Sequence, residues 1–170
     1  RLIVQGSGRP SLADPFRALA AASPTRVTFI ERFDRAMARR IYAGADAFVM
    51  PSRFEPCGQG QMIALRYGTP PIVHRTGGLA DTVVDETLHP GAGTGFVFEH
   101  PTPEGLLWAC DQAVALHARD DGSAWADLQA RGMSVDFDWV TGAAPHYVDA
   151  YRRAIALRAA ARTAGASARP

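Results

Sequence analysis

The segment that decides the fold is ADAFVMPSRFEPCGQGQMIALRYGTPPIVHRTGG, residues 45–78. Two apolar runs within it, residues 47–50 and 71–74, are typical of short strands that are buried on both faces. The residues between them, 59–67, have a helical pattern that ends at Gly68. A strand, a helix and a second apolar strand in this order indicate a parallel β–α–β unit.

The same alternation of strands and helices continues on both sides of this unit. Further strands are predicted over residues 2–5, 27–30 and 95–98, and further helices over residues 11–22, 34–44, 79–86, 103–118, 123–132 and 140–162. The sequence therefore predicts an α/β fold in which a Rossmann-like parallel sheet carries helices on both faces. Ligands of such sheets bind beyond the carboxyl ends of the strands, where residues 6–9, 51–61 and 75–81 are polar or rich in glycine.

The composition is that of a globular domain. The 170 residues are 47% hydrophobic and 21% charged, which argues against a disordered chain. We predict one domain over residues 1–162, truncated at its N-terminus because a strand begins directly after Arg1, and a polar, disordered tail over residues 163–170. The net charge of +1 argues against nucleic acid or a membrane surface as the main partner. No apolar run approaches the roughly 20 residues that span a bilayer.

The cysteines and histidines do not predict a metal site. Cys57 and Cys110 are far apart in the sequence, and the five histidines do not have the spacing of metal ligands. We therefore expect neither a metal nor a cofactor.

The segment PSRFEPCGQGQ, residues 51–61, is the candidate for chemistry. Glu55 follows a predicted strand and precedes a predicted helix, so its carboxylate is expected at the mouth of the sheet. Residues 57–60 open that helix, where unpaired backbone N–H groups favour an anion such as a diphosphate. A carboxylate beside such amides suits a phosphorylated sugar, because the carboxylate can accept hydrogen bonds from sugar hydroxyls.

Three ordered blocks in this region resemble one enzyme family. They are PSRFEPCG at residues 51–58, ALRYGT at 64–69 and RTGGLADTV at 75–83. These blocks resemble bacterial glycogen synthases and plant starch synthases, which are retaining glucosyltransferases of the GT-B fold. The resemblance extends over nearly the whole chain and implies that the chain is the C-terminal, nucleotide-sugar-binding half of such an enzyme.

The resemblance implies roles for the residues around the sugar and the diphosphate. Glu55 matches the glutamate that binds the donor glucose and helps to stabilise an oxocarbenium-like transition state. Cys57 and Gly58 match residues that contact the sugar. Gln59 and Gly60 match positions whose backbone amides hold the diphosphate.

Further positions match the nucleoside side of the family's site. Phe33 lies where the family has a tyrosine that stacks on the nucleobase, and Gly6 and Gly8 match the turn that the nucleoside approaches. Gly77 and Gly78 are assigned to substrate binding, with a plain turn that requires positive φ as an equal alternative.

The chain departs from the family pattern at three points that bear on the donor site, the first being Met62-Ile63 in place of the usual Leu-Tyr. The family commonly has Gly-Leu-Thr-Gln at residues 58–61, so the threonine hydroxyl is lost at Gly60. His74 replaces an arginine, and we expect a structural role for it rather than proton transfer.

The resemblance implies transfer of glucose from ADP-glucose or UDP-glucose to the non-reducing end of an α-1,4-glucan, with retention of configuration. The family's N-terminal domain binds the glucan acceptor, and an arginine and a lysine upstream of residue 1 hold the diphosphate, so we expect this chain alone to be inactive. A cytoplasmic location is expected, or a plastid in a plant. The alternatives are another retaining GT-B glycosyltransferase and a non-catalytic nucleotide-sugar-binding module.

Overall fold

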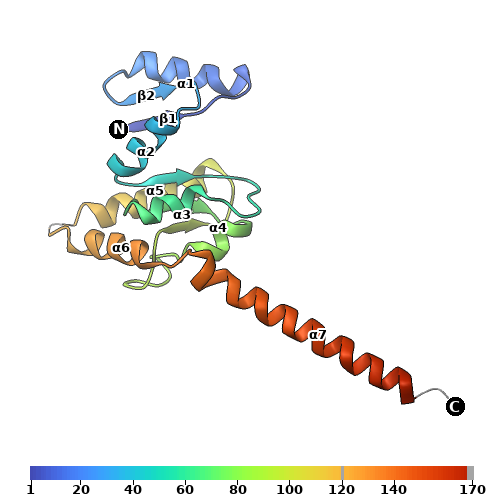
Figure 1. Ribbon diagram of the computed structural model, residues 1–170. Coiled ribbons are helices and arrows are strands. Elements are labelled where there is room, and N and C mark those ends of the chain that lie inside the picture. Colours follow the sequence, from blue (N-terminus) through green and yellow to red (C-terminus); the bar gives the residue numbers. More distant parts are fainter. Residues whose placement is uncertain (120, 168–170) are drawn as a thin grey trace. The chain divides into compact units, whose positions relative to one another are not determined.

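The structure is a computed structural model that describes residues 1–119 and 121–167 (Figure 1). The chain divides into two compact units, Arg1–Met133 and Ser134–Pro170. The single domain expected over residues 1–162 stays a prediction, and each unit is described by itself.

The first unit alternates strands and helices as the sequence predicts. Its strands are β1 (Leu2–Gln5), β2 (Val27–Ile30), β3 (Phe48–Met50), β4 (Pro71–His74) and β5 (Phe96–Phe98). Its helices are α1 (Pro10–Ala22), α2 (Arg35–Gly44), α3 (Gly60–Arg66), α4 (Gly77–Thr82), α5 (Pro103–His117) and α6 (Ser123–Ser134). The helix predicted over residues 79–86 departs most, because it begins at Gly77 and ends at Thr82.

All the strand pairs among the described residues are parallel, but they form two sheets rather than one. β1 pairs with β2, with Leu2 opposite Val27. β4 lies between β3 and β5, with Ile72 opposite both Val49 and Phe96. Apolar runs identify strands, whereas partners are chosen by contacts between distant segments, which explains why the sequence did not predict this division.

Helices cover both faces of the three-stranded sheet, because neighbouring residues of a strand point to opposite sides. One face packs against α5 and α6 through a buried cluster of Ile72, Phe96, Phe98, Ala109, Ala113, Leu116, Trp125 and Leu128. The other face packs against α4 through Val73, Leu79, Val83 and Val97, with Met50 beside them. All four residues of β4 are buried, so this strand is the centre of the core.

Local signals in the sequence fix α2 and join it to the three-stranded sheet. Asp34 caps the helix by accepting a hydrogen bond of 2.9 Å from the backbone N–H of Met37, which lowers the pKa of its carboxyl. At the other end, Thr69 Oγ1 donates to the carbonyl of Tyr42 at 2.5 Å, and the Tyr42 ring lies 5.0 Å from that of Phe48.

The second unit is a long helix, α7 (Ala144–Ser167), preceded by a wide helical turn over Trp139–Ala143. Asp138 caps that turn by accepting from the N–H groups of Val140 and Thr141. The helix predicted over residues 140–162 is therefore present, and its backbone continues five residues into the predicted tail. The remaining tail residues, 168–170, lie outside the described residues.

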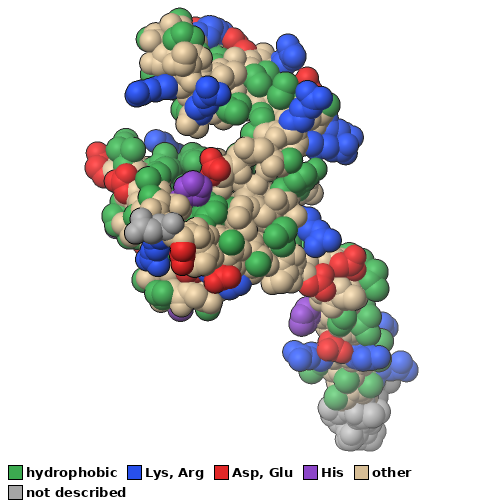
Figure 2. Space-filling model, turned by 90° about the vertical axis from the view of Figure 1, so that its left-hand side faces the viewer, with side chains coloured by type: hydrophobic (Ala, Val, Ile, Leu, Met, Phe, Trp, Pro, Cys, Tyr) green, Lys and Arg blue, Asp and Glu red, His purple; other side chains and the backbone are tan. Residues whose placement is uncertain are grey.

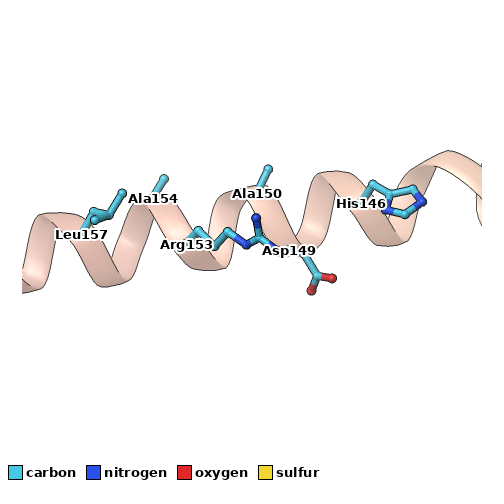
Figure 3. A pocket seen from close by; sticks show the side chains of 6 residues that line it. All are labelled: His146, Asp149, Ala150, Arg153, Ala154 and Leu157. Atoms are coloured by element: carbon cyan, nitrogen blue, oxygen red, sulfur yellow. The ribbon is translucent and has the colours of Figure 1, made fainter.

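A shallow hollow on α7 is lined by His146, Asp149, Ala150, Arg153, Ala154 and Leu157 (Figure 3). All six residues belong to this one helix, so no other element within residues 1–119 and 121–167 lines the hollow. On the face shown in Figure 2, acidic and basic side chains are interspersed. None of the described helices is long and apolar enough to cross a membrane.

Leu128 of α6 tests the packing of the larger cluster, because its side chain is completely buried. We expect Leu128→Ala to lower the free energy of unfolding by about 2–5 kcal/mol through lost contacts and a cavity. Leu107→Ala on α5 is the matched control, since Leu107 is 61% exposed, and its effect should be about 0.5 kcal/mol or less. Urea denaturation measures both, and equal losses would contradict the packing described.

Candidate functional site

The candidate site is the loop that joins β3 to α3. It begins at Pro51 and ends at Gln59, the residue that precedes α3. Gly58 has φ of +72°, a left-handed conformation that favours glycine. The loop follows the carboxyl end of β3, where ligands of parallel sheets bind.

Glu55 lies in the middle of this loop with its side chain partly buried. Ser52 Oγ donates a hydrogen bond of 3.3 Å to its Oε2 atom. The backbone carbonyl of Glu55 accepts a hydrogen bond of 3.0 Å from the N–H of Gly78. Both the carboxylate and the backbone of the predicted catalytic residue are therefore held in place.

Gly77 and Gly78 let the start of α4 touch the loop backbone directly. A Cβ atom on Gly77 would lie 2.1 Å from the carbonyl oxygen of Glu55, and one on Gly78 would lie 1.9 Å from that of Cys57. Gly77 also has φ of +42°. This packing requires both glycines without a ligand, so it supports the turn alternative, and their contact with a substrate stays a prediction.

Cys57, Gly58 and Gly60 continue the same loop into the helix. Cys57 is exposed, while Gly58 is buried. A Cβ atom on Gly60 would lie 3.2 Å from the Phe48 ring and 3.3 Å from Met50 Sδ, so a small residue fits where α3 begins against β3. Gln59 is exposed. The ligand contacts of these four residues stay predictions.

Phe33, Gly6 and Gly8 form a second group at the ends of β1 and β2. Gly6 N–H donates to the carbonyl of Ile30 at 3.1 Å, and Gln5 Nε2 donates to the carbonyl of Asp34 at 2.8 Å. These bonds bring the turn after β1 beside the residue that follows Phe33. Phe33 is 79% exposed, which excludes a core role and leaves its face open for stacking.

The structure thus gathers Glu55, Cys57, Gly58, Gly77 and Gly78 into one cluster, which Gln59 and Gly60 continue. Gly6, Gly8 and Phe33 are not joined to that cluster by any hydrogen bond among the described residues. An added Cβ on Gly6 or Gly8 would meet nothing within 4 Å, so packing does not explain these two glycines.

His74 holds the start of the loop. It is buried at the end of β4, its Nδ1 atom lies 2.8 Å from the carbonyl oxygen of Ser52, and its ring centre lies 5.5 Å from that of Phe98. A ring N–H that donates to a backbone carbonyl fits the structural role expected for His74.

Gln61 is the residue of this site that sequence reasoning missed. It is fully buried and donates hydrogen bonds to the carbonyls of Cys57 and Gly58. The missed signal is its spacing: Gln61 shares the buried face of α3 with Ala64 and Leu65, where a polar side chain needs partners.

The acidic, cysteine and histidine side chains of the described residues include no group of three or more that could hold a metal ion. The arrangement instead offers one carboxylate on a loop held by its own backbone. This can orient hydroxyl groups and stabilise positive charge that develops beside Glu55.

The fold and this loop define the chain as a domain of the GT-B glycosyltransferase class. It is similar to the catalytic domain of starch synthase IV from Arabidopsis thaliana bound to ADP and acarbose, with a TM-score of 0.78 and 33% identity. That match covers 91% of this chain and 32% of the Arabidopsis chain. The predicted α/β fold class is confirmed.

More particularly, the chain belongs to the family described as Glycosyl transferases group 1, whose sequence model matches residues 2–121. It is 46% identical over 157 residues to the glycogen synthase of Syntrophotalea carbinolica and 48% identical over 164 residues to that of Aromatoleum aromaticum. The matches cover 92% and 95% of this chain and 32% of each relative. The resemblance to glycogen and starch synthases is confirmed, and the chain spans about a third of the length of these curated relatives.

Gly78→Ala tests the close contact between α4 and the loop. We expect it to lower the free energy of unfolding by about 1–3 kcal/mol, because the new methyl group displaces the Cys57 carbonyl. Gly8→Ala is the control, since a Cβ there meets nothing within 4 Å, and it should change stability by about 0.5 kcal/mol or less. Thermal unfolding compares the two, and an unchanged Gly78→Ala protein would refute the contact.

Proposed function

We propose that this chain is the donor-binding half of a glycosyltransferase of the glycogen and starch synthase type. The enzyme transfers glucose from ADP-glucose, or UDP-glucose, to the non-reducing end of an α-1,4-glucan with retention of configuration. The observation that carries the proposal is Glu55, which stands in the PSRFEPCG block and is held between Ser52 Oγ and the N–H of Gly78. The identity of 46–48% to two glycogen synthases supports it.

ADP-glucose is the preferred donor in this proposal. The motifs are of the bacterial type, and the solved starch synthase that the chain is similar to is described as bound to ADP. Phe33 would stack on the nucleobase, and Gly6 and Gly8 would leave room for the nucleoside. Gln59 and Gly60 would offer backbone N–H groups to the diphosphate.

The reaction requires little covalent chemistry from the protein. The bond between glucose C1 and the diphosphate oxygen breaks, and a bond from C1 to the acceptor 4-hydroxyl oxygen forms on the same face of the sugar. The departing diphosphate accepts the hydroxyl proton. Glu55 binds the donor glucose and stabilises positive charge at C1, while Cys57 and Gly58 contact the sugar.

The glucan acceptor would bind to a domain outside this chain, as the share of the relatives' length suggests. We therefore expect the 170-residue chain alone to bind ADP-glucose weakly and to transfer no glucose. Incorporation of labelled glucose into glycogen measures this, and turnover by the isolated chain would refute it. A cytoplasmic location is part of the same proposal.

Glu55→Gln in the full-length protein tests the catalytic role. We expect kcat to fall about 100-fold or more, because the charge that stabilises the transition state is lost. ADP binding should persist, since the loop backbone is unchanged. Glu104→Gln is the control: Glu104 is an exposed carboxylate in the first turn of α5. Full activity in Glu55→Gln would refute the catalytic role of Glu55. Binding of ADP-glucose without any transfer by the unsubstituted full-length protein would favour a non-catalytic nucleotide-sugar-binding module.

The enzymatic alternative is another retaining GT-B glycosyltransferase that uses a different nucleotide sugar, whereas the departure at Gly58-Gln59-Gly60-Gln61 favours the non-catalytic module. An enzyme for another nucleotide sugar would retain the fold and Glu55. We expect ADP-glucose to outcompete UDP-glucose, GDP-mannose and UDP-galactose as donors in the full-length protein. Competition assays with glycogen as the acceptor measure this, and preference for a donor other than a glucose nucleotide would establish the alternative.

A further inference from the structure

Gln61 contributes a fully buried amide in the first turn of α3. Its Nε2 atom donates to the carbonyl of Cys57 at 3.1 Å, to that of Gly58 at 3.3 Å and to Thr82 Oγ1 at 3.1 Å. Thr82 Oγ1 in turn donates to the carbonyl of Gly78. One side chain therefore links the loop, α3 and α4.

The Gln61 amide occupies the space that a side chain at Gly58 would need. A Cβ atom on Gly58 would lie 2.5 Å from Gln61 Oε1 and 2.9 Å from Nε2. Among the described residues, Oε1 has no hydrogen-bond donor. A buried acceptor without a partner is unfavourable, so the value of a glutamine here lies in the acceptors that its Nε2 atom serves. An apolar side chain of the same length would avoid the unpartnered oxygen but would leave the carbonyls of Cys57 and Gly58 without this donor.

The two carbonyl bonds fix the direction of the N–H groups that follow. A trans peptide unit is planar, and its C=O and N–H bonds point in opposite directions. Because the carbonyls of Cys57 and Gly58 point inward to Gln61, the N–H groups of Gly58 and Gln59 point away from it. Neither N–H has an acceptor among the described residues.

We propose that Gln61 is a positioning residue of the donor site, which turns the Gly58 and Gln59 N–H groups toward the oxygens of the nucleotide sugar. This inference rests on the proposed function, because it takes the outward side of the loop as the donor side. Gln61 itself does not touch the donor. It acts by holding two peptide planes in the orientation that binding requires.

Gln61→Met in the full-length protein is the test. A methionine side chain has a similar length and fills a similar space, but it cannot donate hydrogen bonds. We expect KM for ADP-glucose to rise and kcat to fall, each about 10-fold, because small misplacements of binding groups are costly. KM for glycogen should not change. ADP binding by calorimetry should weaken by a similar factor.

Gln129→Met is the matched control. Gln129 Nε2 donates to the carbonyl of Gly68 at 2.7 Å, beyond the opposite end of α3, so it is also a glutamine held against a backbone carbonyl. It should leave both KM values and kcat within about 2-fold while affecting stability. Equal kinetic losses in the two variants, or unchanged KM and kcat in Gln61→Met, would overturn the proposal.

Two further measurements distinguish a failure of the positioning role from a folding defect and from a failure of the proposed function. Should Gln61→Met fail to fold, Gln61→Asn, which retains a shortened amide, is expected to give the same rise in KM for the donor, and wild-type kinetics there would refute the proposal. Should the wild-type full-length protein transfer no glucose, the proposed function fails, and amide hydrogen exchange decides on Gln61. Exchange at Gly78, whose N–H bonds to the Glu55 carbonyl, should be faster in Gln61→Met than in Gln129→Met, and equal rates would overturn the positioning role.

Discussion

The candidate site depends on one backbone contact, the hydrogen bond from the N–H of Gly78 to the carbonyl of Glu55. It joins the first turn of α4 to the loop after β3, and it forms only because neither Gly77 nor Gly78 has a side chain. The position of the Glu55 carboxylate follows from this bond, since β4 and α4 are anchored in the core through Val73 and Leu79. The side chain predicted to be catalytic is thus placed by glycines that need not touch any ligand.

A site built from backbone groups explains why the chain accommodates its departure from the family pattern. Gln59 is exposed, so its side chain is not constrained by packing. A Cβ atom added to Gly60 would lie within 3.3 Å of side chains from β3. The threonine hydroxyl that the family places at Gly60 is lost, but the N–H groups of the loop remain. Their direction depends on Gly58 and Gln61 rather than on the residues that differ.

The sequence predicted the parts of this structure that depend on local pattern. Strands such as residues 71–74 are apolar on both faces, and the Asp34 cap precedes its helix, so both were predictable. The division into two sheets was not, because pairing depends on contacts between distant segments. Gly77 and Gly78 form the first turn of α4, which begins two residues before the predicted start of that helix, and Gly77 has the positive φ that the turn alternative requires. The hydrogen-bond partners of Gln61 and His74 were not predictable, because these side chains reach the backbone carbonyls only in the folded chain.

His74 and Gln61 hold the loop at its two ends. His74 reaches the carbonyl of Ser52 from β4, and Gln61 reaches the carbonyls of Cys57 and Gly58 from α3. Glu55 lies between these anchors, so its backbone has little conformational freedom left to lose when a ligand binds. The histidine that replaces the family's arginine therefore keeps a structural function, because a ring N–H is sufficient to hold a single carbonyl. Order in this loop comes from side-chain donors on backbone oxygens, and the Glu55 side chain lies between these two anchors.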